Sequence, residues 1–258
     1  MTATSNVIDQ EKMAIILQEV VGKQHDTRFY PVISGVARSI NYYPIGDEKA
    51  EEGTVNLALG LGKYIVDGGQ SLRVSPAHPN QVLQMSEMEM ALRDTQTHFL
   101  ALDMAKMENG VLDVQKDDGF NLRKWSVRDA EPDGTLQWIC STFDPVDQCI
   151  YDGYYEGRNR KIISFAGVLQ NGVFPLPELM QKVLKYGQDE MQRPVEIEFA
   201  VNLNADKTGE FFLLQIRPMV DNRMELNEDL TQVPDEDCIL RSHSAIGHGV
   251  FNEVEDVV

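Results

Sequence analysis

The segment from Val195 to Pro218 constrains the fold of this chain most strongly. Two runs of alternating apolar and polar residues, 195–201 and 210–217, flank a short polar loop that contains a glycine. Alternation with a period of two indicates strands with one buried face, and a short loop between two such strands is typical of an antiparallel hairpin. The segment therefore predicts a β-hairpin.

Four polar side chains stand out on this hairpin. Successive residues of a strand face opposite sides, so Glu196 and Glu198 share one face of the first strand, and Gln215 and Arg217 share one face of the second. Carboxylate and amide oxygens are ligands for Mg²⁺, and a guanidinium binds phosphate through two parallel hydrogen bonds. The pattern favours a Mg-nucleotide site. An ordinary ion pair between a glutamate and Arg217 on a solvated face is the alternative reading.

The other face of the hairpin is apolar and should be buried by a helix. Ile197, Phe199, Phe212 and Leu214 are expected on that face, and the helix expected over 175–191 carries a matching apolar stripe.

The rest of the chain mixes strand and helix patterns. We expect strands at 12–21, 30–37, 121–127, 136–143 and 161–166, a strand followed by a helix across 54–66, and a long amphipathic helix over 86–107. Gly35 interrupts the second of these strands, which indicates a close approach of another group to the backbone. The pattern predicts an α+β fold, a mostly antiparallel sheet flanked by helices, in one domain of about 12–220.

Charge and composition exclude several classes of partner. The chain has 23 basic and 41 acidic residues, a net charge of −18, so we expect neither nucleic acid nor an anionic membrane as partner. Acidic residues dominate after Val220, which predicts a solvated linker over 221–258. Three cysteines without metal-ligand spacing, and the lack of a long apolar run, favour a cytoplasmic protein.

Two hairpin motifs carry a family resemblance. Glu196-Ile-Glu-Phe199 followed by Leu214-Gln-Ile-Arg-Pro218 resembles the end of the ATP-grasp nucleotide-binding domain of phosphoenolpyruvate synthases and pyruvate phosphate dikinases. Further segments resemble the same family in the same order: LQEVVG at 17–22, SGVARS at 34–39, ALGLGKYIVDGG at 58–69, and AIGHG at 245–249. The resemblance implies an ATP-grasp-like partial domain, the second lobe, over 12–220. The linker 221–258 would lead into a phosphohistidine domain that the sequence lacks.

The resemblance also implies roles for individual residues. Glu198 and Gln215 would be ligands of Mg²⁺ and the phosphates, Glu196 a second acidic contact, and Arg217 the catalytic cation that balances charge on the transferred phosphoryl group. The adenine of ATP would lie against four residues, mainly through their backbone: Gln18, Glu19, Val20 and Val21.

The activity implied belongs to the full-length protein. Enzymes of this family split ATP to AMP, transfer a phosphoryl group to a histidine of the phosphohistidine domain, and pass it to pyruvate. The phosphate-gripping segments of the first lobe are missing from the sequence, and so are the phosphohistidine segment and a pyruvate-binding domain. We therefore expect this chain alone to be inactive and to meet pyruvate only through the missing domains. Lys63 stands where the synthases have Glu, which keeps a second hypothesis open: a non-catalytic, nucleotide-responsive or structural binding module.

Overall fold

The fold is known from a computed structural model, which describes residues 14–106, 121–157, 159–204, 206, 208–219 and 234. The strands are β1 (Lys23–His25), β2 (Arg28–Tyr30), β3 (Ile33–Arg38), β4 (Thr54–Ala58), β5 (Leu72–Val74), β6 (His98–Asp103), β7 (Leu122–Ser126), β8 (Cys140–Asp144), β9 (Cys149–Asp152), β10 (Arg160–Ile163), β11 (Val195–Leu203) and β12 (Gly209–Pro218). The α-helices are α1 (Lys63–Val66), α2 (Met88–Asp94), α3 (Ala166–Leu169) and α4 (Leu176–Met191).

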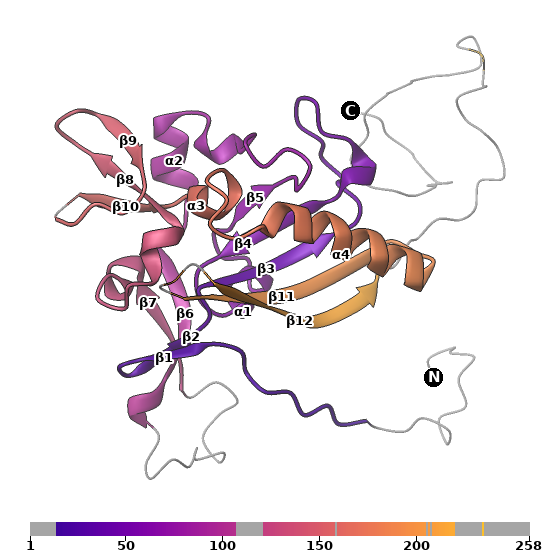
Figure 1. The fold of residues 1–258 in the computed structure, drawn as a ribbon, viewed down its shortest axis with the longest axis horizontal. Helices are drawn as coiled ribbons and strands as arrows, with labels where there is room; N and C mark the ends of the chain where they lie inside the picture. Colours follow the sequence, from indigo (N-terminus) through magenta and orange to yellow (C-terminus); the bar gives the residue numbers. More distant parts are fainter. Residues whose placement is uncertain are drawn as a thin grey trace, which may run out of the picture.

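A five-stranded antiparallel sheet forms the centre of the molecule. Its strand order is β12-β11-β3-β4-β5, with β12 at one edge (Figure 1). Helix α4 packs across one face of this sheet, as the sequence predicted. The contact is close at Gly187, where a Cβ atom would lie 2.8 Å from Cδ1 of Ile216. The face under α4 is therefore apolar and buried, and the other face is left for polar residues.

Two smaller antiparallel sheets complete the fold. One has the order β1-β2-β6-β7 and the other β10-β8-β9. The buried residues form one continuous core, whose members come from the central sheet, α3, α4 and both smaller sheets. The predicted fold class, α+β with antiparallel sheets flanked by helices, is confirmed.

The prediction of a strand at 12–21 is wrong. Residues 14–22 have no regular secondary structure and the first strand begins at Lys23, while 12 and 13 lie outside the described residues. The side chains of Ile15, Ile16 and Leu17 are 86–93% exposed. An apolar β-branched run has strand propensity, but it forms a strand only beside a partner strand, and this run has no such partner among the described residues.

The prediction of a long helix over 86–107 is also wrong. Helix α2 ends at Asp94, and β6 follows, with Phe99, Ala101 and Asp103 buried on one face. Between them the buried side chain of Gln96 bonds both the N–H and the C=O of Leu59, which fixes the chain against the end of β4. The strand expected at 136–143 likewise opens as a 3₁₀ turn before β8, and the strand expected at 161–166 ends in α3.

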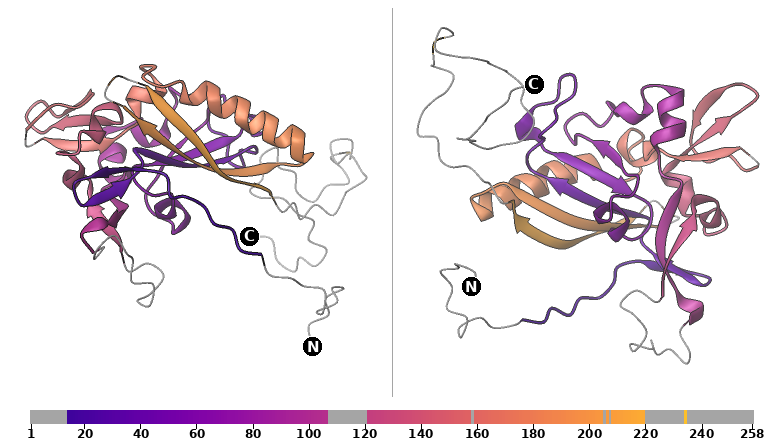
Figure 2. Two further views of the ribbon diagram at one scale, coloured as in Figure 1. Left: turned by 60° about the horizontal axis from the view of Figure 1, so that its bottom comes forward. Right: turned by 180° about the vertical axis from the view of Figure 1, so that it is seen from behind.

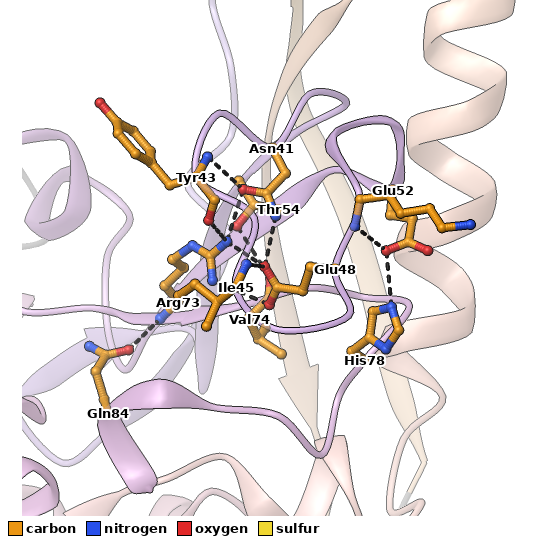
Figure 3. A network of polar contacts seen from close by, with 11 residues as sticks. Asn41, Tyr43, Ile45, Glu48, Glu52, Thr54, Arg73, Val74, His78 and Gln84 are labelled. Carbon is orange, nitrogen blue, oxygen red and sulfur yellow. Dashed lines mark hydrogen bonds and ion pairs between the residues drawn. The ribbon is translucent and has the colours of Figure 1, made fainter. Parts of the chain in front are cut away.

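A buried glutamate anchors the loop that follows β3 (Figure 3). The carboxylate of Glu48 accepts hydrogen bonds from Arg73 at 2.7 Å, from Asn41 at 2.8 Å and from the backbone N–H of Ile45 at 3.1 Å. Burial alone would raise the pKa of Glu48, but these bonds outweigh it and lower the pKa. The network ties the loop after β3 to β5, at the end of the sheet where Arg38 lies.

The linker expected at 221–258 lies outside the described residues, apart from Pro234. None of the helices in the described part of the chain combines the length and the apolar character that crossing a bilayer requires.

Candidate functional site

The predicted hairpin is present, and its register brings the four polar residues together. Strands β11 and β12 are antiparallel neighbours, with Glu196 opposite Arg217 and Glu198 opposite Gln215. Their side chains lie on the face of the sheet away from α4, because Ile197, between the two glutamates, is buried against that helix. The sequence-predicted constellation is therefore one patch on one face.

A β-bulge changes the second half of the hairpin. The register shifts between Glu198 and Phe199, so Leu214 is the extra residue and Phe199 lies opposite Leu213. Beyond the bulge Phe211 turns toward the core and stacks on Phe199, with ring centroids 5.3 Å apart. The expectation that Phe212 and Leu214 are buried is wrong, since both are only half-buried.

Pairing across the sheet extends the polar patch into a mostly polar face, which also carries three buried apolar residues, Val36, Ala58 and Ala200. The residues in register with the two glutamates on β3, β4 and β5 share their side of the sheet. This polar face carries Ser34, Arg38, Thr54, Asn56, Arg73, Glu196, Glu198, Asn202, Gln215 and Arg217. The opposite face of the same strands is apolar, so the sheet separates core from polar surface.

Glu196 lies between two arginines. One of its carboxylate oxygens accepts a hydrogen bond from Nε of Arg38 at 2.7 Å, and the other accepts from Nε of Arg217 at 2.9 Å and also from Nη2 of Arg217. Burial alone would raise the pKa of Glu196, but the two guanidinium groups outweigh it and lower the pKa. The same contact raises the pKa of Arg217. The cross-strand ion pair considered from the sequence is thus present, and it is one half of an Arg38–Glu196–Arg217 triad.

Glu198 differs from its neighbour. It is half-buried, and its carboxylate makes no hydrogen bond or ion pair with any side chain of the described residues. Gln215 lies opposite it and is exposed. The described part of the chain contains no cluster of three or more acidic, histidine or cysteine side chains that could hold a metal alone. One carboxylate with one amide oxygen suits Mg²⁺, which takes its remaining ligands from phosphates and water.

The segment with Gln18, Glu19, Val20 and Val21 runs along the hairpin. The side-chain amide of Gln18 donates a hydrogen bond to the backbone C=O of Leu214 at 3.0 Å, and Lys23 donates to the side chain of Asn204. Figure 2 shows this indigo segment on the side of the central sheet that α4 does not cover. The segment therefore borders the polar face, as expected from the sequence, although it is not a strand.

Among the described residues, no contact joins the Lys63 side chain to the polar face. Lys63 opens the short helix α1 after the glycine turn, and its Nζ pairs at 2.8 Å with Asp67, the residue at the C-terminal end of that helix. Both side chains are at least half exposed, which is typical of a solvated helix pair. The helix itself lies over the polar face, because a Cβ at Gly62 would lie 3.6 Å from Cβ of Ser34.

The sequence patterns identify only the four hairpin residues of this face as candidate site residues, and Arg38 of β3 and Phe212 of β12 are among those that they do not identify. Arg38 lies in SGVARS, a segment that carries the family resemblance without a role for its arginine, and a period-two alternation from Ala37 would have placed it on the polar side. Phe212 lies opposite Ala200 on the polar face, because the bulge reverses the alternation there. No sequence signal marks the bulge.

Comparison with known proteins gives one family. A search of curated protein sequences found no match to this chain. The family model of the pyruvate phosphate dikinase AMP/ATP-binding domain, in contrast, matches residues 4–236, which is most of the chain. This chain therefore belongs to the pyruvate phosphate dikinase AMP/ATP-binding domain family, as the ATP- or AMP-binding part of an enzyme of that kind.

Proposed function

We propose that this chain binds Mg-ATP on its polar face, as part of a phosphotransferase that carries a phosphoryl group from ATP to a histidine and then to pyruvate. The observation that carries the proposal is the position of Glu198 beside Gln215, unpaired, next to two arginines on one sheet face. The histidine would belong to the phosphohistidine domain of the same full-length protein, and pyruvate would be bound by other domains. The two described cysteines are free, in keeping with the cytoplasmic location we propose.

Each residue of the site has a proposed role. Glu198 and Gln215 bind Mg²⁺ through a carboxylate and an amide oxygen, and Arg217 binds the transferred phosphoryl group. Glu196 acts as the acceptor that orients the guanidinium of Arg217, because both of its oxygens are engaged by arginines. The backbone of residues 18–21 contacts adenine. Bound Mg²⁺ would neutralise charge on the phosphate oxygens during transfer.

Manganese binding tests the metal assignment without any turnover. Mn²⁺ replaces Mg²⁺ at oxygen sites, and its paramagnetism makes the bound ion visible by water-proton relaxation. With ATP present, we expect the wild-type chain to enhance relaxation and Glu198→Gln to weaken Mn-ATP binding by about tenfold or more. Glu178→Gln is the matched control, since Glu178 is an exposed residue of α4 on the other side of the sheet. Equal binding by Glu198→Gln and wild type would remove Glu198 from the site.

The second candidate function is a non-catalytic binding module. A binding module that keeps the fold without turnover is favoured by Lys63, which stands where the synthases have an acid and pairs within its own helix. The two functions differ in the full-length protein. Incubation with ATP labelled at the β-phosphate labels a histidine of the enzyme, whereas a binding module retains nucleotide and takes up no label.

A further inference from the structure

Arg38, the second arginine of the triad, has hydrogen-bond donors to which the proposed function assigns no role. Arg38 comes from β3 and reaches Glu196 across the sheet through Nε alone. Its terminal nitrogens Nη1 and Nη2 have no hydrogen-bond partner among the residues that the structure describes. The Arg38 side chain is 39% exposed, whereas the Glu196 side chain that holds it is 10% exposed. The guanidinium is therefore fixed on its inner side and open on its outer side.

Arg73, an arginine of this face outside the triad, has both of its terminal nitrogens engaged. Arg73, on β5, donates to Glu48 through both terminal nitrogens, and also to Asn41 and to the backbone C=O of Tyr43. Those contacts account for Arg73 as a structural residue that holds a loop. Arg38 has one contact, so a structural role leaves most of its donors unexplained.

Charge balance also separates Arg38 from a purely structural role. Arg217 already pairs with Glu196 through two nitrogens, so the carboxylate is neutralised without Arg38. The triad of two guanidinium groups and one carboxylate therefore carries one excess positive charge. Glu198 is on the same face, acts electrostatically on Arg217, and is not hydrogen-bonded to any side chain of the described residues. A ligand that brings Mg²⁺ to Glu198 would balance the charge of that glutamate with the metal. The excess positive charge of the triad would then be available to the phosphates of the ligand.

We propose that Arg38 is a phosphate-binding residue of the nucleotide site, and that its outer nitrogens donate hydrogen bonds to the polyphosphate of Mg-ATP. The inference rests on the proposed function, because it needs nucleotide on the polar face. Glu196 then positions two arginines instead of one: it holds Nε of Arg38 and Nε of Arg217 and turns both guanidinium groups toward the same ligand. Two guanidinium groups fixed on one carboxylate are held in place before the ligand binds, so less side-chain entropy is lost on binding.

Titration calorimetry with the wild-type chain and Arg38→Ala tests the proposal. The probes are Mg-ATP and inorganic tripolyphosphate, which has the phosphates without the nucleoside. Loss of a charge-assisted hydrogen-bonding group should weaken both probes to a similar extent, by about 10- to 100-fold. Arg38→Lys keeps the charge but loses the planar fork, so we expect an intermediate loss. Arg93→Ala is the control, because Arg93 is an exposed arginine of α2 that pairs with Asp94 outside the polar face.

The outcomes separate this inference from the function on which it rests. If wild type and Arg217→Ala differ in Mg-ATP binding while Arg38→Ala matches wild type within about twofold, Arg38 is only a partner of Glu196 and the function stands. A variant that loses Mg-ATP but not tripolyphosphate also overturns the inference, because the contact is then not to phosphate. A wild-type chain that binds neither probe overturns both. Should Arg38→Ala fail to fold, the Arg38→Lys comparison with both probes decides in the same way.

Discussion

Phe199 of β11 packs directly on Gly35 of the neighbouring strand β3. A Cβ atom at position 35 would lie 2.2 Å from Cζ of the Phe199 ring, closer than any real contact. The ring is 1% exposed and stacked on Phe211, so it has little room to withdraw. Gly35 is therefore required for the apolar face of the sheet that carries Glu196 and Glu198 on its other side.

Gly35→Ala should destabilise the protein by about 1–3 kcal/mol, because the added methyl forces an overpacked core to shift. The free energy of unfolding from urea denaturation measures the effect. Gly62→Ala is the control: its Cβ would meet Ser34 at an ordinary 3.6 Å, and it should change stability by less than about 0.5 kcal/mol. Equal stability of Gly35→Ala and wild type would mean that the Phe199 ring can move aside.

The central sheet was predictable where alternation and turn residues agree. The hairpin and α4 follow from period-two and helical patterns, and both were found at nearly the expected residues. The helix over 86–107 was mispredicted because Phe99 and Leu102 have a helical spacing of three residues, whereas in β6 they lie on opposite faces and Phe99 is the buried one. Buried contacts decided between the two, above all the hydrogen bonds of Gln96 to Leu59, which lies far away in the sequence. The local sequence pattern contains no information on which distant residues a segment will contact.

The candidate site was predictable only in part for a related reason. Residues that share a strand face can be read from alternation, so the four polar residues of the hairpin were found together. Arg38 is on another strand, and its contact with Glu196 depends on which strand lies beside β11. The bulge at Leu214 depends on the fit of the paired strands and brings Phe212 to the polar face. Strand order and bulges are properties of the folded sheet.

The pH dependence of stability should reveal the anchoring of Glu48. Its pKa is lowered from the ordinary value of 4.5, so the charged form is favoured in the folded state. The resulting stabilisation is complete above pH 4.5 and is lost as the pH falls through the lower pKa of the folded state. The ionised carboxylate of Glu196 also stabilises the folded state, and this stabilisation is lost at low pH in the same way, since the pKa of Glu196 is also lowered.

Glu48→Gln should therefore lower the free energy of unfolding by about 1–3 kcal/mol at neutral pH, where the lost hydrogen bonds matter most. The difference from wild type should stay constant from neutral pH down to about pH 4.5 and shrink below it, as the pH falls through the lowered pKa of Glu48 in the folded state. Urea denaturation across this range measures it. Glu51→Gln removes an exposed acid of the same loop and should follow the wild-type curve. A constant difference between wild type and Glu48→Gln at all pH values would show that Glu48 is not ionised in the folded protein.

Arg217 offers the sharpest separation of structure from function. Its side chain is 57% exposed, and its removal leaves Glu196 paired with Arg38, so Arg217→Ala should change the free energy of unfolding by less than about 1 kcal/mol. If Arg217 balances charge on the transferred phosphoryl group, the same substitution in the full-length enzyme should lower turnover by roughly 10³-fold or more. Arg217→Lys should recover little, because one ammonium cannot bind Glu196 and a phosphate in the geometry of a planar fork. Stability is measured by urea denaturation and turnover by formation of AMP from ATP. A variant with normal stability and a near-normal rate would reduce Arg217 to a cross-strand partner of Glu196.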